Sequence, residues 1–168
     1  MIKIIDNFLD LKEFEEIKGC MESSQFPWYF NKSSKVYEGD GKCQHTHMFF
    51  GISKKNYGDI KSDWLDMWNN FMIKVESTKC YRIKANMTLK LPSQKPDDQD
   101  WHFDLQGEAL KTATFYINTN DGYTEFKNGV KVESVANRVC IFDSTLQHRG
   151  VGHTSPDNHR IVVNFNYS

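Results

Sequence analysis

The sequence lacks the features that mark several large classes of protein. Its 21 basic and 22 acidic residues leave a net charge of −1, so charge predicts neither nucleic acid nor an anionic membrane as a partner. No apolar run approaches the roughly 20 residues that a membrane-spanning helix needs. The N-terminal stretch alternates apolar with charged residues, unlike a secretory signal, and no segment repeats or has low complexity.

Cysteine is scarce and widely spaced. The four cysteines, Cys20, Cys43, Cys80 and Cys140, form no C-x-x-C pair. This spacing argues against a zinc knuckle and against a framework of disulfide bonds. We therefore expect reduced, structural thiols in a cytoplasmic protein.

The N-terminal part of the chain has the apolar spacing of helices. In residues 10–22 the apolar side chains recur at helical spacing, and Asp10 is a suitable N-cap. Residues 59–77 have the same period. An apolar stripe of this kind normally packs into a core, so we expect two helices here.

Near residue 80 the apolar period changes from 3.6 to 2. The stretch RIKANMTLKL (82–91) alternates strictly. Further strand-like runs occupy 111–118, 130–135, 138–143 and 160–167, with turn-like segments between them. Short strands beside amphipathic helices favour an antiparallel sandwich or barrel with the helices packed outside it.

The sequence WHFD (101–104) contains two potential metal ligands, His102 and Asp104. An H-x-D pair is weak on its own. A third candidate, His148, lies just beyond the strand-like run 138–143, where it could reach the mouth of a barrel. Two imidazoles and one carboxylate form the facial triad that suits non-haem Fe(II), whereas structural zinc more often has four ligands with cysteine among them.

Two further side chains could form an anion site. A period of two places Arg160 on one face of its strand with Val162 and two asparagines. If this face points inward, the guanidinium needs an anionic partner, and a carboxylate held by two hydrogen bonds suits it. Tyr116 in the run 111–118 could add a phenolic donor. A metal, an arginine and a tyrosine together describe a pocket for a small dicarboxylate that chelates iron.

The order of these elements resembles the 2-oxoglutarate- and Fe(II)-dependent oxygenases, and the prolyl-4-hydroxylase-like branch most of all. The matching pieces are WHFD (101–104), FYIN (115–118), GYTEF (122–126), FDSTLQHRG (142–150) and HRIVVNF (159–165). The N-terminal half is similar to that of small phage or bacterial members. The resemblance implies a double-stranded β-helix (jelly roll) flanked by N-terminal helices. It implies one oxygenase domain over residues 1–168, with helical support over about 1–78 and the catalytic core over about 79–168.

Residue by residue, the resemblance implies that His102, Asp104 and His148 bind the iron. Arg160, twelve residues beyond His148, matches the residue that binds the distal carboxylate of 2-oxoglutarate. Tyr116 matches a residue that assists this arginine in some members.

Some assignments within the resemblance have rivals or departures. His153 and His159 compete with His148, although their intervals to Arg160 are shorter than is usual in the family. Asn86 is a candidate for contact with 2-oxoglutarate, because its strand borders the cosubstrate in the family, and Arg82 on the same face is a weaker candidate. Tyr123 stands where the family often has a second glycine.

The implied reaction converts 2-oxoglutarate and dioxygen to succinate and CO₂ and hydroxylates a C–H bond of a primary substrate. The presence of Asp104 favours a hydroxylase, because halogenating relatives vacate that position. A prolyl or other peptidyl residue is the first expectation for the substrate, a free small molecule comes next, and nucleic acid is not expected. A cupin-like metalloprotein and a non-catalytic binding module remain alternatives. The expected location is the cytoplasm, or the host cytoplasm if the chain is phage-encoded.

Other groups of residues have both a structural and a functional interpretation. His45 and His47 could mimic a metal pair but have no third ligand at an obvious spacing, so we expect a loop or a substrate-side position. Segments 25–50 and 92–101 are expected to recognise the substrate. The acidic residues before His102 form a solvated loop or a lid, and several aromatic residues either pack or line a substrate wall. These are Asp97, Asp98 and Asp100, and Trp28, Tyr29 and Trp101.

Overall fold

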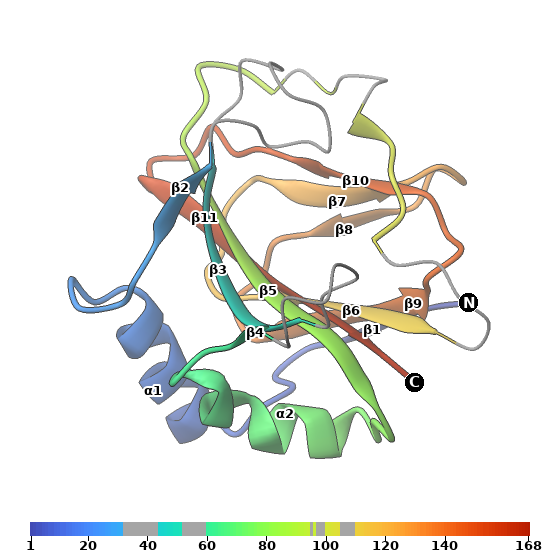
Figure 1. The fold of residues 1–168 in the computed structure, drawn as a ribbon. Coiled ribbons are helices and arrows are strands. Elements are labelled where there is room, and N and C mark those ends of the chain that lie inside the picture. The colour runs from blue at the N-terminus through green and yellow to red at the C-terminus, as the bar shows by residue number, and fades with distance from the viewer. Residues whose placement is uncertain (32–43, 52–59, 95, 97–99, 105–109) are drawn as a thin grey trace.

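The computed structural model describes residues 1–31, 44–51, 60–94, 96, 100–104 and 110–168 (Figure 1). Over these residues the chain is mostly β, as the sequence predicts. The described ranges contain two α-helices, α1 (Leu11–Met21) and α2 (Asn69–Lys74), and the short 3-10 helix η1 (Leu65–Trp68) precedes α2. None of the helices in these ranges is long and apolar enough to cross a membrane.

The strands of the described part of the chain form two antiparallel sheets. In the described residues the larger sheet has eight strands and the smaller sheet has three. The larger sheet runs in the order β1 (Ile2–Ile5), β9 (Arg138–Asp143), β6 (Lys111–Tyr116), β11 (His159–Tyr167), β5 (Cys80–Leu89), β3 (Gln44–Gly51) and β2 (Tyr29–Asn31), with β4 (Ile60–Lys61) paired to β3. The smaller sheet runs β10 (His148–Val151), β7 (Tyr123–Phe126) and β8 (Lys131–Glu133). The smaller sheet and the helices lie on opposite sides of the larger sheet (Figure 1).

One face of the larger sheet forms a hydrophobic core with the helices. The buried cluster on this face combines helix and strand residues, among them Phe14, Ile17, Phe71, Ile83, Phe115, Val163 and Phe165. Phe71 of α2 stacks on Phe165 of β11, with ring centroids 3.9 Å apart. Burying such a ring contributes about 2 kcal/mol, so α2 is fixed against the middle of the sheet.

The opposite face of the larger sheet packs against the smaller sheet. A second buried cluster joins the two sheets and contains Tyr116, Phe126, Val132, Cys140, Phe142 and Val162. Val162 therefore faces the smaller sheet, whereas Ile161 and Val163 face the helices. The alternation predicted for residues 160–167 is confirmed, and it directs Arg160 toward the space between the sheets.

The first predicted helix is confirmed, and the second is confirmed only over residues 65–74. Asp10 caps α1, and its Oδ1 accepts a hydrogen bond of 3.0 Å from the Lys12 amide. Within the predicted helix 59–77, residues 60 and 61 pair with β3 instead, and only η1 and α2 are helical. Strand pairing with β3 overrides the helical period at the start of this segment. Glu76, with φ of 55°, leaves the helical conformation at its end.

The N-terminal region also contributes more strands than we expected. β1 pairs with β9, and β2 and β3 extend the larger sheet beyond β5. Residues 1–78 are therefore not a purely helical support. By contrast, the predicted runs that begin at residues 82, 111, 138 and 160 correspond to β5, β6, β9 and β11.

Candidate metal centre

The main chain joins the two segments that carry His102 and His148. The His102 amide donates to the His148 carbonyl oxygen at 3.0 Å, and the His148 amide donates back to the His102 carbonyl oxygen at 3.1 Å. His148 is the first residue of β10, at the edge of the smaller sheet. This reciprocal pair of bonds places the two imidazoles side by side, with ring centroids 4.7 Å apart.

Backbone carbonyls orient both imidazoles. Nδ1 of His102 lies 2.8 Å from the Asp100 carbonyl oxygen, and Nδ1 of His148 lies 3.1 Å from the Leu146 carbonyl oxygen. A carbonyl oxygen only accepts, so each Nδ1 carries the proton, and each Nε2 is left with a lone pair. Burial lowers the pKa of His148, which favours the neutral ring that a metal requires.

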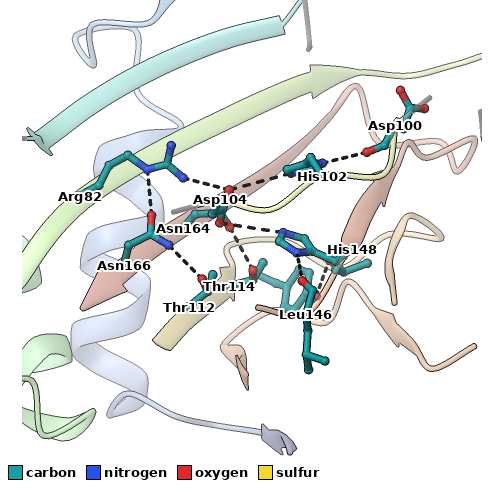
Figure 2. A network of polar contacts seen from close by, with 12 residues as sticks. Arg82, Asp100, His102, Asp104, Thr112, Thr114, Leu146, His148, Asn164 and Asn166 are labelled. Atoms are coloured by element: carbon teal, nitrogen blue, oxygen red, sulfur yellow. Dashed lines mark hydrogen bonds and ion pairs between the residues drawn. The ribbon is translucent and has the colours of Figure 1, made fainter. Parts of the chain in front are cut away.

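The carboxylate of Asp104 lies beside the Nε2 atoms of His102 and His148, so the three side chains form one group (Figure 2). Oδ1 of Asp104 lies 3.9 Å from Nε2 of His102, and its Oδ2 lies 3.9 Å from Nε2 of His148. Burial opposes ionisation of Asp104, yet Arg82 and the two histidines outweigh it, and the pKa falls below its ordinary value of 3.8. Asp104 is thus a carboxylate, and its buried Oδ2 has no hydrogen-bond partner in the described part of the chain.

These three residues fit a metal ion. One ligand atom from each of His102, Asp104 and His148 can be chosen so that all three lie within 4.8 Å of one another. A buried carboxylate oxygen without a donor is costly unless something else binds it. Two imidazoles and one carboxylate suit non-haem Fe(II). The side chain of His102 is 41% exposed, against 5% for His148, so the group is more open on the His102 side.

Arg160 forms a second polar feature between the sheets. Its side chain is buried, its Nε donates to Ser134 Oγ at 2.8 Å, and its buried Nη2 has no hydrogen-bond partner in the described residues. Gly122 makes room for it, because a Cβ there would lie 2.7 Å from Arg160 Cδ. An unpaired guanidinium in this position could bind a carboxylate.

Tyr116 lies close to this arginine. The guanidinium carbon is 5.8 Å from the centroid of the Tyr116 ring, and the Tyr116 hydroxyl donates to Thr124 Oγ1 at 2.8 Å. Burial raises the pKa of this phenol, so it stays protonated. Asn86 pairs with Val162 across the β5–β11 ladder. Its contact with 2-oxoglutarate stays a prediction.

The histidines considered as rivals lie elsewhere. His153 is buried and its Nε2 donates to the Asp157 carbonyl oxygen, whereas His159 Nε2 lies 3.4 Å from a carboxylate oxygen of Glu22. His45 and His47 lie on β3 rather than in a loop, and they pair with Met87 and Ala85, which face the helices. His47 is held by the Pro27 carbonyl oxygen and Ser62 Oγ, both at 2.8 Å. None of the four joins the group around Asp104.

The aromatic and acidic candidates have mixed outcomes. Trp28 packs against the helix-side core and donates to the Met21 carbonyl oxygen, while Tyr29 is exposed. Trp101 stacks against two cationic side chains, Arg149 and Lys127. The predicted acidic loop includes Asp97 and Asp98, which lie outside the described residues, as do Cys43 and parts of both segments expected to recognise substrate.

The contact between Arg82 and Asp104 is not predicted by the sequence. The sequence makes Arg82 only a weaker candidate than Asn86 for contact with 2-oxoglutarate, yet its Nη2 lies 2.9 Å from Asp104 Oδ1. Its position on the inner face of β5 could be read from the alternation of residues 82–91. No sequence signal indicates that the loop carrying Asp104 returns to this strand.

No family model and no curated protein matches the sequence. Solved structures do share its fold. A prolyl-4-hydroxylase from Pseudomonas putida matches with a TM-score of 0.63 and 11% identity, over 99% of this chain and 91% of that one. A prolyl hydroxylase from Trichoplax adhaerens, in complex with a peptide of the hypoxia inducible factor oxygen degradation domain, has a TM-score of 0.60 and 13% identity, over 99% and 82%.

HygX from Streptomyces hygroscopicus, with nickel, 2-oxoglutarate and hygromycin B bound, is also similar. Its TM-score is 0.56 and its identity 10%, over 99% of this chain and 82% of that chain. Identities this low show a common fold. The resemblance to 2-oxoglutarate oxygenases and their prolyl-4-hydroxylase-like branch, read from five short motifs, is confirmed at that level.

Proposed function

We propose that this chain is an Fe(II)- and 2-oxoglutarate-dependent dioxygenase of the prolyl-4-hydroxylase-like branch. It would couple decarboxylation of 2-oxoglutarate to succinate with hydroxylation of a C–H bond. The observation that carries the proposal is that the metal-ligand group and Arg160 contact the same buried cluster between the sheets. His148 of the group His102, Asp104 and His148 packs on Phe126 and Phe142, and the Arg160 guanidinium lies over Tyr116. The catalytic unit would be one jelly-roll domain over residues 1–168, flanked by α1 and α2.

The roles of the side chains follow from their partners. The Asp100 and Leu146 carbonyl oxygens fix the imidazole tautomers, so both Nε2 atoms are ready to bind metal. Asp104 contributes a negative charge in a buried setting. When bound, Fe(II) would supply a redox-active Lewis acid with open positions for the keto acid and dioxygen.

Arg160 would hold the distal carboxylate of 2-oxoglutarate. Its Nε already donates to Ser134, and its buried Nη2 has no partner in the described residues, so Nη2 could donate to an anion. The Tyr116 ring lies beside the guanidinium, and its neutral hydroxyl would add a second donor near the carboxylate by turning its proton away from Thr124 Oγ1, which can donate to the phenol oxygen in return. Burial around Arg160 would exclude water, which strengthens both contacts.

The primary substrate is proposed to be a prolyl or another peptidyl residue. The structural neighbours include one with a peptide and one with hygromycin B, so the fold accepts both peptides and small molecules. The exposed side of His102 is the side from which a substrate would approach. The cytoplasm is the proposed location, which agrees with the free thiols of Cys20, Cys80 and Cys140.

Thermal unfolding with added ligands tests the proposal. Mn²⁺ should raise the Tm, and 2-oxoglutarate should raise it further only when the metal is present, because a ligand that binds the native state stabilises it. Asp104→Ala should lose both responses, and Arg160→Ala should lose only the response to 2-oxoglutarate. A metal response without any 2-oxoglutarate response in the wild type would favour the cupin-like alternative. Absence of both would favour a non-catalytic module.

Turnover needs a separate measurement. The Fe(II)-loaded protein in air should release succinate from 2-oxoglutarate in the presence of a peptide library, and His148→Ala should not. Ligand binding without succinate from any peptide or small-molecule pool would contradict the assignment as an enzyme.

A further inference from the structure

We propose that Arg82 is a positioning residue for Asp104. Arg82 binds Oδ1 of Asp104, so that Asp104 presents only Oδ2 to the metal. The inference rests on the proposed function, because it assumes that Asp104 is a metal ligand. Figure 2 shows the guanidinium on one side of the carboxylate and His148 on the other.

The first observation is how unevenly the two carboxylate oxygens are used. Oδ1 receives the Arg82 Nη2 at 2.9 Å, whereas Oδ2 is buried and has no donor in the described residues. The side chain of Asp104 is only 7% exposed, so water offers little compensation. A pair that served stability alone would be expected to satisfy both oxygens, as bidentate arginine–carboxylate pairs do. Oδ2, the oxygen beside His148, is left free, and an oxygen that binds a metal must be free in this way.

The second observation is that Arg82 is itself held in place. Its Nε donates to Asn166 Oδ1 at 2.9 Å, and Asn166 Nδ2 donates to Thr112 Oγ1 at 2.9 Å. Asn166 and Thr112 are both fully buried. Arg82, Asn166 and Thr112 lie in register on the neighbouring strands β5, β11 and β6. A relay across three strands therefore fixes the guanidinium before Asp104 meets it.

The third observation is that Asp104 needs such a support. It sits in a bend outside the strands, where no sheet hydrogen bond fixes its side chain. Each histidine is oriented by the carbonyl oxygen of the residue two positions before it, but Asp104 is oriented by a side chain from the larger sheet. Through Arg82 the larger sheet thus fixes the position of Asp104, the third ligand, while the smaller sheet fixes the position of His148.

Lys84 provides a matched control. It lies two residues from Arg82 on the same face of β5, and its pKa is lowered by burial and by Arg82 and raised by Asp104. No hydrogen bond or ion pair joins its ammonium group to Asp104 in the described residues. Lys84→Gln therefore removes one nearby positive charge without removing the positioning bond.

The test measures metal affinity and Co(II) spectra without 2-oxoglutarate. Loss of an outer-sphere partner of a ligand typically costs 10- to 100-fold in metal affinity, so Arg82→Gln should weaken Co(II) binding by about that factor. Lys84→Gln should bind Co(II) as tightly as the wild type or more tightly, because only a repelling charge is lost. The visible d–d bands of Co(II) should change shape in Arg82→Gln, because Asp104 can then offer both oxygens, and should be unchanged in Lys84→Gln.

A second variant guards against misfolding of the first. Asn166→Ala keeps Arg82 but removes its anchor, and it should weaken Co(II) binding in the same direction by a smaller factor. Arg82→Gln with wild-type affinity and spectrum would overturn the inference, as would equal weakening by Lys84→Gln. If the wild type binds Co(II) but Arg82→Gln changes nothing, only the positioning role fails. If the wild type binds no metal, the proposed function fails with it.

Discussion

Arg149 lies over the ring of Trp101, with its guanidinium carbon 4.2 Å from the ring centroid. Trp101 directly precedes His102, and Arg149 directly follows His148. The stack therefore reinforces the main-chain bridge between the two histidines. Glu125 fixes Arg149 in turn, with Oε2 2.7 Å from Nη2.

Removing this stack should loosen His102 and His148, the two imidazoles of the candidate metal centre. A cation–π contact of this kind contributes about 1 kcal/mol. Trp101→Ala should therefore weaken metal binding about fivefold, which isothermal titration with Mn²⁺ can measure. Tyr123→Ala is the control. It removes a comparable cation–π contact on the smaller sheet, with Lys131 Nζ 4.9 Å from the ring centroid, but Tyr123 is not adjacent in sequence to a candidate metal ligand. Equal losses in both variants would contradict a role for the stack.

A methyl group at Gly122 should disturb the anion site without touching the metal site. The added Cβ would lie 2.7 Å from Arg160 Cδ and 2.9 Å from its Nε, so the guanidinium must move. Gly122→Ala should raise the Kd for 2-oxoglutarate about tenfold, or about 1.4 kcal/mol, at unchanged metal affinity. In Gly150→Ala the new Cβ stays 3.9 Å from Arg160 Nη1, so the same titration should give the wild-type Kd.

Asn137 should be the most sensitive polar position away from the site. Its buried side chain accepts from the Leu9 amide and donates to the Leu9 carbonyl oxygen, both at 2.9 Å, and its φ is 59°. Asn137→Ala loses both bonds and strains the left-handed backbone, so unfolding in urea should show a loss of about 3 kcal/mol.

Asn137→Gly separates the two causes, because glycine tolerates this φ. It should lose about 2 kcal/mol, the share of the hydrogen bonds. A loss below 0.5 kcal/mol in both variants would show that Asn137 does not join the β1–α1 connection to β9.

The half-buried thiol of Cys80 and the buried thiol of Cys140 should react slowly in the native state. Burial raises the pKa of Cys80 to about 11 and that of Cys140 to about 12, so little thiolate forms at pH 8. In a Cys43→Ser background, iodoacetamide should modify both thiols at pH 8 far more slowly in buffer than in 6 M urea. Equal rates in the two solvents would contradict their burial.

The acid stability of the metal-free protein should depend on Asp121. Its slight burial opposes ionisation, but hydrogen bonds from Thr154 and Ser155 hold its pKa below 3.8. A carboxyl whose pKa is lower in the folded state stabilises the protein above about pH 3.8, and this contribution is lost as the pH falls through the folded value. Asp121→Asn should lower the Tm at pH 7, and the gap to the wild type should narrow below pH 3.8. A gap that is constant with pH would contradict this linkage.

The sequence predicted the parts of the fold that depend on local periodicity. The alternation in β5 and β11 predicted which side chains of these strands face inward, including Arg160. Local periodicity failed where long-range strand pairing determines the conformation. At residues 60 and 61, pairing with β3 overrides the helical period. β10 was missed because HRGV has no apolar alternation, and its strand conformation comes from pairing with β7.

The candidate site divides in the same way. His102, Asp104 and His148 were predicted from order and residue type, and the structure brings them together. The contact of Arg82 with Asp104 depends on the register of β5 against β11 and on the path of the loop after Trp101, which no local pattern specifies.

The central claim is most directly tested by an anaerobic titration of the Fe(II)-loaded protein with 2-oxoglutarate. A keto acid chelated to ferrous iron gives a visible charge-transfer band. We predict a saturable band that is absent in His148→Ala and needs more 2-oxoglutarate in Arg160→Ala. Iron that is demonstrably bound but gives no band at saturating 2-oxoglutarate would contradict the assignment as a 2-oxoglutarate oxygenase.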